Sequence, residues 1–181
     1  MADLMGYFII GGILIVAVMV LYLPFFFLLR GRVSTGRQLC LIFFTGSCLI
    51  MLYATIFSAW GADAFHPKEH HLNVIPFIAL GDSEGMSEDK MIVQAVANII
   101  MFIPYGFFLP MVFTRLRSFS RTAFAVFATS FSIEFIQYFL GATADIDDII
   151  LNFVGGILGY TLYATVFRYL LHHRRTLRDR Q

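Results

Sequence analysis

The sequence predicts an all-α protein, a bundle of about five helices that cross a membrane. Its 181 residues are 59% apolar and only 14% charged, and the mean hydropathy is +0.77. Soluble domains carry about 25% charged residues. A soluble domain of this length could not bury so much apolar surface, so lipid must solvate much of it.

Five apolar segments are long enough to cross a bilayer, because one crossing takes roughly 20 residues. We expect helices at about 5–29, 39–59, 92–113, 122–140 and 148–171. The first segment is too long for the apolar core of a secretory signal, which indicates a retained helix. The one long connection covers about 60–91, and its short apolar part, 72–77, is expected to re-enter the outer leaflet or to cover the helix ends.

The placement of basic residues predicts the orientation of the helices. Of the 13 Lys and Arg residues, 11 lie in the 30–37 and 115–121 connections or after residue 167. Acidic residues dominate the 60–91 and 141–147 connections. Cytoplasmic loops are enriched in Lys and Arg. We therefore expect the N-terminus outside and the C-terminus in the cytoplasm of a multi-pass protein.

Polar side chains inside the predicted helices point to a site, because such groups are rare in membranes and are usually functional. Glu134 shares a helix face with Ser130, one turn earlier, and with Gln137. At 1.5 Å per residue, Asn98 and Glu134 lie about 9 Å below the outer ends of their helices, and Asn152 about 6 Å. We expect these three residues to converge on a cavity open to the outside. Just above them lie four further polar residues, Gln137, Asp145, Asp147 and Asp148.

Simpler interpretations stay open for several of these residues. Asp147 or Asp148 is also suited to cap the fifth helix, and Asn98 to join two helices by hydrogen bonds. Glu134 is the hardest to explain structurally, because the predicted membrane segments offer it no Lys or Arg partner. Gly155 and Gly159 stand in the GxxxG spacing that lets helices approach closely.

The sequence predicts neither a disulfide nor a metal centre, and it identifies no cofactor. Cys40 and Cys48 lie eight residues apart in one apolar run, too far apart on a helix to bridge. The histidines at 66, 70 and 71 are interpreted as loop residues, and the acidic run after residue 144 lacks the spacing of an EF-hand loop.

The polar residues belong to motifs that together resemble the VanZ-like family of bacterial membrane proteins. These motifs are Leu72-Asn73-Val74-Ile75-Pro76-Phe77, then Asn98 to Phe107 with Pro104 and Gly106, then Ser132 to Gln137 with Glu134, and Asp145 to Asn152 followed by Gly155, Gly156, Gly159 and Tyr160. The resemblance covers about residues 40–165. It divides the chain into an additional N-terminal helix with its cytoplasmic turn (1–37), a VanZ-like transmembrane domain (38–171) and a basic tail (172–181).

The resemblance implies a protein of the bacterial cell membrane. The founding member of the family is associated with low-level resistance to teicoplanin, a lipophilic glycopeptide that acts outside the membrane. The family often has an Arg shortly before its acidic motif, whereas this sequence has Ala142-Thr143-Ala144. This departure from the family pattern puts in question the built-in cationic partner that the resemblance would imply for the carboxylates.

Three functions are compatible with this sequence. The first is a non-enzymatic protein that binds an amphiphile or lipid-linked envelope precursor at the outer leaflet, and so affects glycopeptide action. The second is an intramembrane enzyme on such a substrate, with Glu134 as general acid or base and Asp147 or Asp148 orienting water or a cation. The third is a small proton-coupled transporter or flippase. The ligand-binding residues expected in the first two are Asn73, Asn98, Gln137, Asp145 and Asn152. A homo-oligomer stays open, and no nucleic-acid partner is expected.

Overall fold

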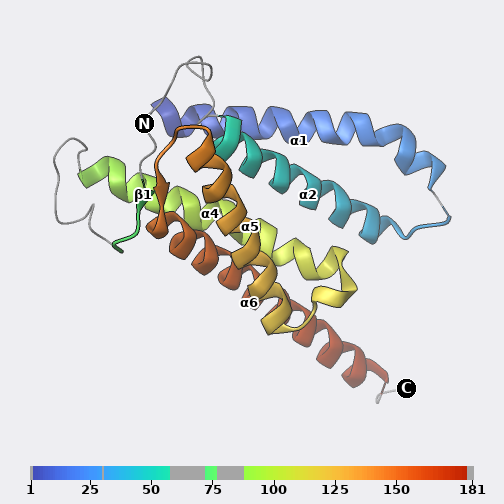
Figure 1. The fold of residues 1–181 in the computed structure, drawn as a ribbon. Helices are drawn as coiled ribbons and strands as arrows, with labels where there is room; N and C mark the ends of the chain where they lie inside the picture. Colours follow the sequence, from blue (N-terminus) through green and yellow to red (C-terminus); the bar gives the residue numbers. More distant parts are fainter. Residues whose placement is uncertain (1, 30, 58–71, 77–87, 179–181) are drawn as a thin grey trace.

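The computed structural model describes residues 2–29, 31–57, 72–76 and 88–178, and it confirms an all-α bundle (Figure 1). The described helices are α1 (Ala2–Leu28), α2 (Thr35–Leu52), α4 (Glu88–Val112), α5 (Phe119–Phe139) and α6 (Ile146–Arg178). A π-helical turn, η1 (Tyr53–Phe57), continues α2, and a 3₁₀ turn, η3 (Thr114–Leu116), follows α4. The predicted helices are therefore present, with ends shifted by a few residues.

Three described helical stretches are long and apolar enough to cross a membrane, namely Thr35–Ile56, Met91–Val112 and Ile146–Phe167. Helix α1 adds a shorter apolar stretch, Val16–Leu28. Helix α5 is less apolar because it carries Arg121, Glu134 and Gln137 together with several Ser and Thr. Five crossings and the orientation of the chain stay predictions.

Helix α6 is longer than predicted. Its 33 residues extend to Arg178, through most of the tail that the sequence analysis placed after residue 171. At 1.5 Å per residue the helix is about 50 Å long, more than the hydrocarbon core of a bilayer requires.

Helices α4 and α6 form the most extensive interface of the bundle, with their backbones in close contact (Figure 1). A Cβ atom added at Gly155 would overlap the carbonyl of Ile99, and one at Gly159 would overlap that of Ile103. Gly106 of α4 lies in the same way against Gly156. Small residues at a helix interface allow this approach, so the predicted GxxxG face is where the two helices meet.

Apolar side chains from α2, α4 and α5 form the core. The most buried members are Met51, Phe102, Tyr105, Leu109, Val126 and Ile133. Many other large apolar side chains are exposed, including a row of phenylalanines on α5 at positions 124, 127, 131, 135 and 139. A surface of this kind is suited to lipid.

A short parallel bridge holds two connections together at the end of the bundle where α5 ends and α6 begins. Strand β1 (Leu72–Asn73) pairs with β2 (Ala144–Asp145), with Asn73 opposite Asp145. The described part of the 72–77 motif thus lies over the helix ends, in agreement with one of the two expectations. The loop histidines at 66, 70 and 71 lie outside the described residues.

Candidate functional site

A direct contact joins the polar residues of α4 and α6. Asn98 Nδ2 donates a hydrogen bond of 2.5 Å to Asp148 Oδ1 in the first turn of α6. Gln94, one turn before Asn98, also hydrogen-bonds Asp148. Both amides therefore hold the Asp148 side chain against α4.

Glu134 of α5 is almost fully buried, with 4% of its surface exposed. Its Oε2 accepts the backbone N–H of Asp145 at 2.9 Å, so the carboxylate holds the connection that precedes α6. The side chain also lies within electrostatic range of Asp148 and Asp145. The hydrogen bond from Asp145 thus joins the end of α5 to the segment before α6, and the Asp148 carboxylate lies nearby.

Asp145 receives further bonds on its side chain. Both carboxylate oxygens accept hydrogen bonds of 3.2 Å from Asn73 Nδ2, and Oδ1 accepts the N–H of Asp147 at 2.9 Å. Asn73 Oδ1 in turn accepts the N–H of Ile75 at 3.2 Å. The side-chain pair and the β1–β2 bridge together fix the 72–76 segment beside the acidic motif.

A second contact joins α5 and α6 one turn deeper in the bundle. Asn152 Nδ2 donates to Ser130 Oγ at 3.1 Å, and the two residues are 1% and 0% exposed. Asn152 Oδ1 is buried and has no hydrogen-bond partner among the described residues. An unpaired buried carbonyl oxygen is costly, so this acceptor calls for a donor from outside the described residues.

We refer to these residues together as the polar cluster, which consists of Asn73, Asn98, Ser130, Glu134, Asp145, Asp148 and Asn152. The cluster includes residues of α4, α5 and α6, and its contacts extend over about one helical turn. Glu134 and Asn152 are nearly inaccessible in it, and the expected cavity open to the outside stays a prediction. Asp147 adjoins the cluster through its backbone N–H.

Gln137 makes its contact on a different side of α5. Its Nε2 donates to the backbone carbonyl of Thr55 in η1 at 3.1 Å, and its Oε1 is buried without a partner among the described residues. The expected ligand-binding residue therefore joins α5 to the end of α2, outside the hydrogen-bond network of the polar cluster.

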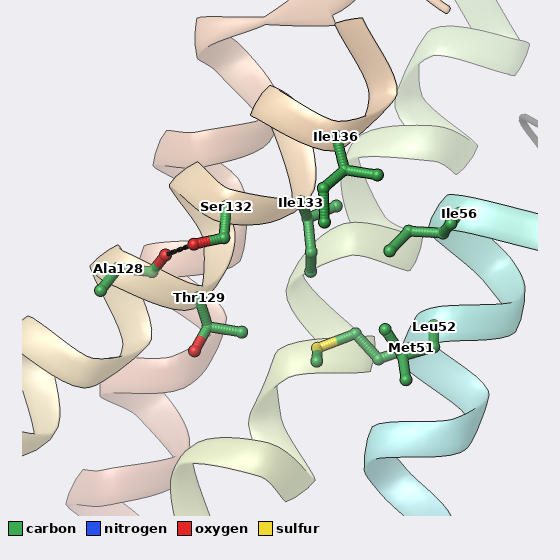
Figure 2. Close-up of a pocket in the computed structure, with 8 residues that line it drawn as sticks. All are labelled: Met51, Leu52, Ile56, Ala128, Thr129, Ser132, Ile133 and Ile136. Carbon is green, nitrogen blue, oxygen red and sulfur yellow. Dashed lines mark hydrogen bonds between the residues drawn. The ribbon is translucent and has the colours of Figure 1, made fainter. Parts of the chain in front are cut away.

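An apolar groove runs between α2 and α5, close to the contact made by Gln137 (Figure 2). Its volume is about 300 Å³. The lining residues are Met51, Leu52, Ile56, Ala128, Thr129, Ser132, Ile133 and Ile136. The Ser132 hydroxyl points back to the carbonyl of Ala128 at 2.7 Å, which leaves the groove essentially hydrocarbon in character. No residue of the polar cluster lines this groove, although Ile133 precedes Glu134 directly.

The comparisons with known proteins identify the family. Residues 13–168 match the family described as VanZ/LLP1. The chain belongs to this family. It is also 38% identical over 101 residues to Protein VanZ of Enterococcus faecium, an alignment that covers 55% of this chain and 56% of the enterococcal protein. The chain thus aligns with about half the length of this VanZ relative. No solved structure shows a significant match.

The resemblance to the VanZ-like family is confirmed, and the matched region begins inside α1. The division of this VanZ-family chain at residue 37 stays a prediction. Cys40 and Cys48 are free thiols in the structure.

Two contact residues of this VanZ-family protein were missing from the predicted site. Gln94 could have been found, because it stands one turn before Asn98 on the same face of α4. Thr55 could not, because it acts through its backbone carbonyl, which is available to Gln137 in the π-helical turn. π-helical turns often lie next to functional sites.

The chemistry available to the polar cluster is that of carboxylates and amides. The described residues include no group of three or more His, Cys, Asp and Glu side chains placed to hold a metal ion. The cluster is able to accept hydrogen bonds, attract positive charge and exchange protons through Glu134 or Asp148.

Proposed function

We propose that this protein is a multi-pass protein of the bacterial plasma membrane whose polar cluster binds a lipid-linked or amphiphilic envelope molecule from the outer side. One observation carries the proposal. Glu134, a carboxylate that is 4% exposed, lies within an apolar bundle beside two more acidic side chains. Ionisable groups inside membrane proteins are expensive and usually mark a ligand or ion site.

The distribution of polar and apolar surface on α5 favours an amphiphile over a fully water-soluble ligand. Glu134 belongs to the polar cluster, while its neighbours Ile133 and Ile136 line the groove toward α2. A polar headgroup and a hydrocarbon tail would therefore find suitable surfaces within one turn of the same helix.

An effect on glycopeptide susceptibility is part of the same proposal. The relative with 38% identity is named Protein VanZ. Binding an envelope precursor or a lipophilic glycopeptide at the outer leaflet would change how much of that molecule reaches its partners there. We propose that expression of this chain shifts susceptibility to teicoplanin-like molecules in a way that depends on Glu134.

The test is lipid mass spectrometry on the gently purified full chain. We expect a specific amphiphile to co-purify with the wild type and to be reduced at least several-fold in Glu134→Gln. Thr161→Ala is the matched control, because the Thr161 side chain is exposed and its hydroxyl donates to the carbonyl of Ile157 in its own helix. Equal amounts of the same lipids in all three samples would contradict the proposal.

A second candidate, an intramembrane enzyme, is favoured by the electrostatic contact between Glu134 and Asp148. Two carboxyl groups that interact at a buried site are able to share a proton and act as acid and base. In this case Glu134→Gln would retain the bound molecule and abolish its conversion, so product in the wild type and accumulated substrate in the variant would identify the enzyme.

A further inference from the structure

One buried acceptor of the polar cluster has no donor among the described residues. Asn152 is 1% exposed, and its Nδ2 is occupied by Ser130 while its Oδ1 has no partner in the described part of the chain. Asn152 stands one turn after Asp148 on α6, so the unpaired oxygen belongs to the same face as that carboxylate. The buried atom left to be satisfied is therefore an acceptor.

The hydrogen bonds described for the carboxylates of Glu134, Asp145 and Asp148 come from neutral amides, namely backbone N–H groups and Asn and Gln side chains. Lys90 stands at the same end of α4, and its side chain lies outside the described residues. The arginines in the 31–37 and 114–121 regions adjoin the start of α2, the end of α4 and the start of α5. These helix ends are opposite to those that carry the cluster, which lie at the start of α4 and α6 and the end of α5.

We infer that the molecule bound at the polar cluster presents an ammonium group to it. This inference rests on the proposed function and specifies its ligand. A primary ammonium supplies three N–H donors together with a positive charge, which matches an unpaired amide oxygen beside several carboxylates. A phosphate would add negative charge and acceptor oxygens to a site that already has an excess of both.

A phosphate bridged by a divalent cation is less suited to this geometry. Such a bridge needs several carboxylate oxygens around one point, and the described acidic side chains are not grouped in that way. The ammonium could belong to an aminophospholipid headgroup or to the amine of a lipid-linked or lipidated peptide, and both offer the same chemistry.

The test uses single-chain probes that share one tail and differ in headgroup. Dodecylamine, dodecyltrimethylammonium and dodecyl phosphate are titrated onto the full chain in dodecyl maltoside, and native mass spectrometry counts the bound molecules. We expect dodecylamine to bind at least about tenfold more tightly than dodecyl phosphate, since one hydrogen bond to a charged group accounts for that ratio. Dodecyltrimethylammonium has the charge without N–H donors and should bind with intermediate affinity.

Asp148→Asn is the principal variant, because its side-chain oxygen still accepts the bond from Asn98 and the fold should be retained. We expect Asp148→Asn to lose most of the preference for dodecylamine over dodecyl phosphate. Glu134→Gln should lose the same preference independently, and the control Thr161→Ala should retain it. Two further probes then distinguish the sources of the ammonium. Lysophosphatidylethanolamine represents an aminophospholipid headgroup and dodecanoyl-lysine amide represents a lipidated peptide, and the one that binds more tightly identifies the source.

Two outcomes would overturn the inference in different ways. Tighter binding of dodecyl phosphate, sensitive to Asp148→Asn, would exclude an ammonium ligand and leave the proposed function in place. Binding of all three probes that is unchanged in both acidic variants would contradict the ammonium inference and the proposed function together.

Discussion

Asn98 on α4 donates a hydrogen bond of 2.5 Å to the carboxylate of Asp148 on α6, across 50 positions of sequence. The two residues lie in different family motifs, so the contact joins the motif that runs from Asn98 to Phe107 to the motif that runs from Asp145 to Asn152. It also lies next to the region in which glycines bring α4 and α6 together. The bond is thus both part of the candidate site and part of the main helix interface.

The first prediction concerns the strength of this contact. Asn98→Ala removes a donor from a buried carboxylate and should lower the free energy of unfolding by about 1.5–3 kcal/mol. A double-mutant cycle with Asp148→Ala, measured by unfolding in mixed detergent micelles, should give a coupling free energy of similar size. The pair Asn98→Ala and Thr161→Ala is the additive control. Additivity within about 0.5 kcal/mol for Asn98 and Asp148 would contradict the contact.

The second prediction separates the structural role of Glu134 from its chemical role. Glu134→Gln retains an oxygen that accepts the N–H of Asp145, so the variant should unfold within about 1 kcal/mol of the wild type. Glu134→Ala leaves that N–H unpaired and should lose about 1–3 kcal/mol. Equal melting temperatures of the two variants would show that the bond to Asp145 contributes nothing to the fold.

The sequence predicted the helices well because the hydropathy of a membrane segment depends on local composition alone. That Asn98, Glu134 and Asn152 lie at one depth stays a prediction, which follows from helical rise and chain direction. The pattern of residues within one helix does not determine which residues of other segments each side chain contacts. Gln137 is three residues from Glu134, yet its amide reaches the carbonyl of Thr55 in a π-helical turn that no pattern in the sequence predicted.

The same limit applies to the bonds of Asp145. The polarity of the helices indicates that their charged and amide groups avoid lipid. It does not indicate that Asp145 accepts bonds from Asn73 and Asp147 and donates its N–H to Glu134. The bond from Asn73 joins residues 72 positions apart, next to the β1–β2 bridge, which a sequence pattern does not reveal.

The third prediction concerns the contact between α4 and α6. Gly159→Ala places a Cβ against the backbone carbonyl of Ile103, which has no freedom to move aside, and should cost about 3 kcal/mol through separation of the helices. Gly12→Ala on α1 is the matched control, because nothing lies within 4 Å of its added Cβ. Its helix should be unchanged or stabilised by up to about 1 kcal/mol. Thermal unfolding that ranks the two variants in the reverse order would exclude close backbone packing at Gly159.

The last prediction tests the orientation of the chain, on which the outward-facing site depends. In a background with Cys40 and Cys48 replaced by alanine, single cysteines are introduced at Thr143, between α5 and α6, and at Ser118, between η3 and α5. Both positions are exposed, and the Ser118 side chain makes no capping bond, so neither change should disturb the fold. Because basic residues flank position 118 and acidic residues follow position 143, a membrane-impermeant maleimide added to intact cells should label Thr143→Cys and not Ser118→Cys. Permeabilised cells should label both. Labelling of Ser118→Cys alone in intact cells would place the polar cluster on the cytoplasmic side, and a ligand from the outer envelope would then be excluded.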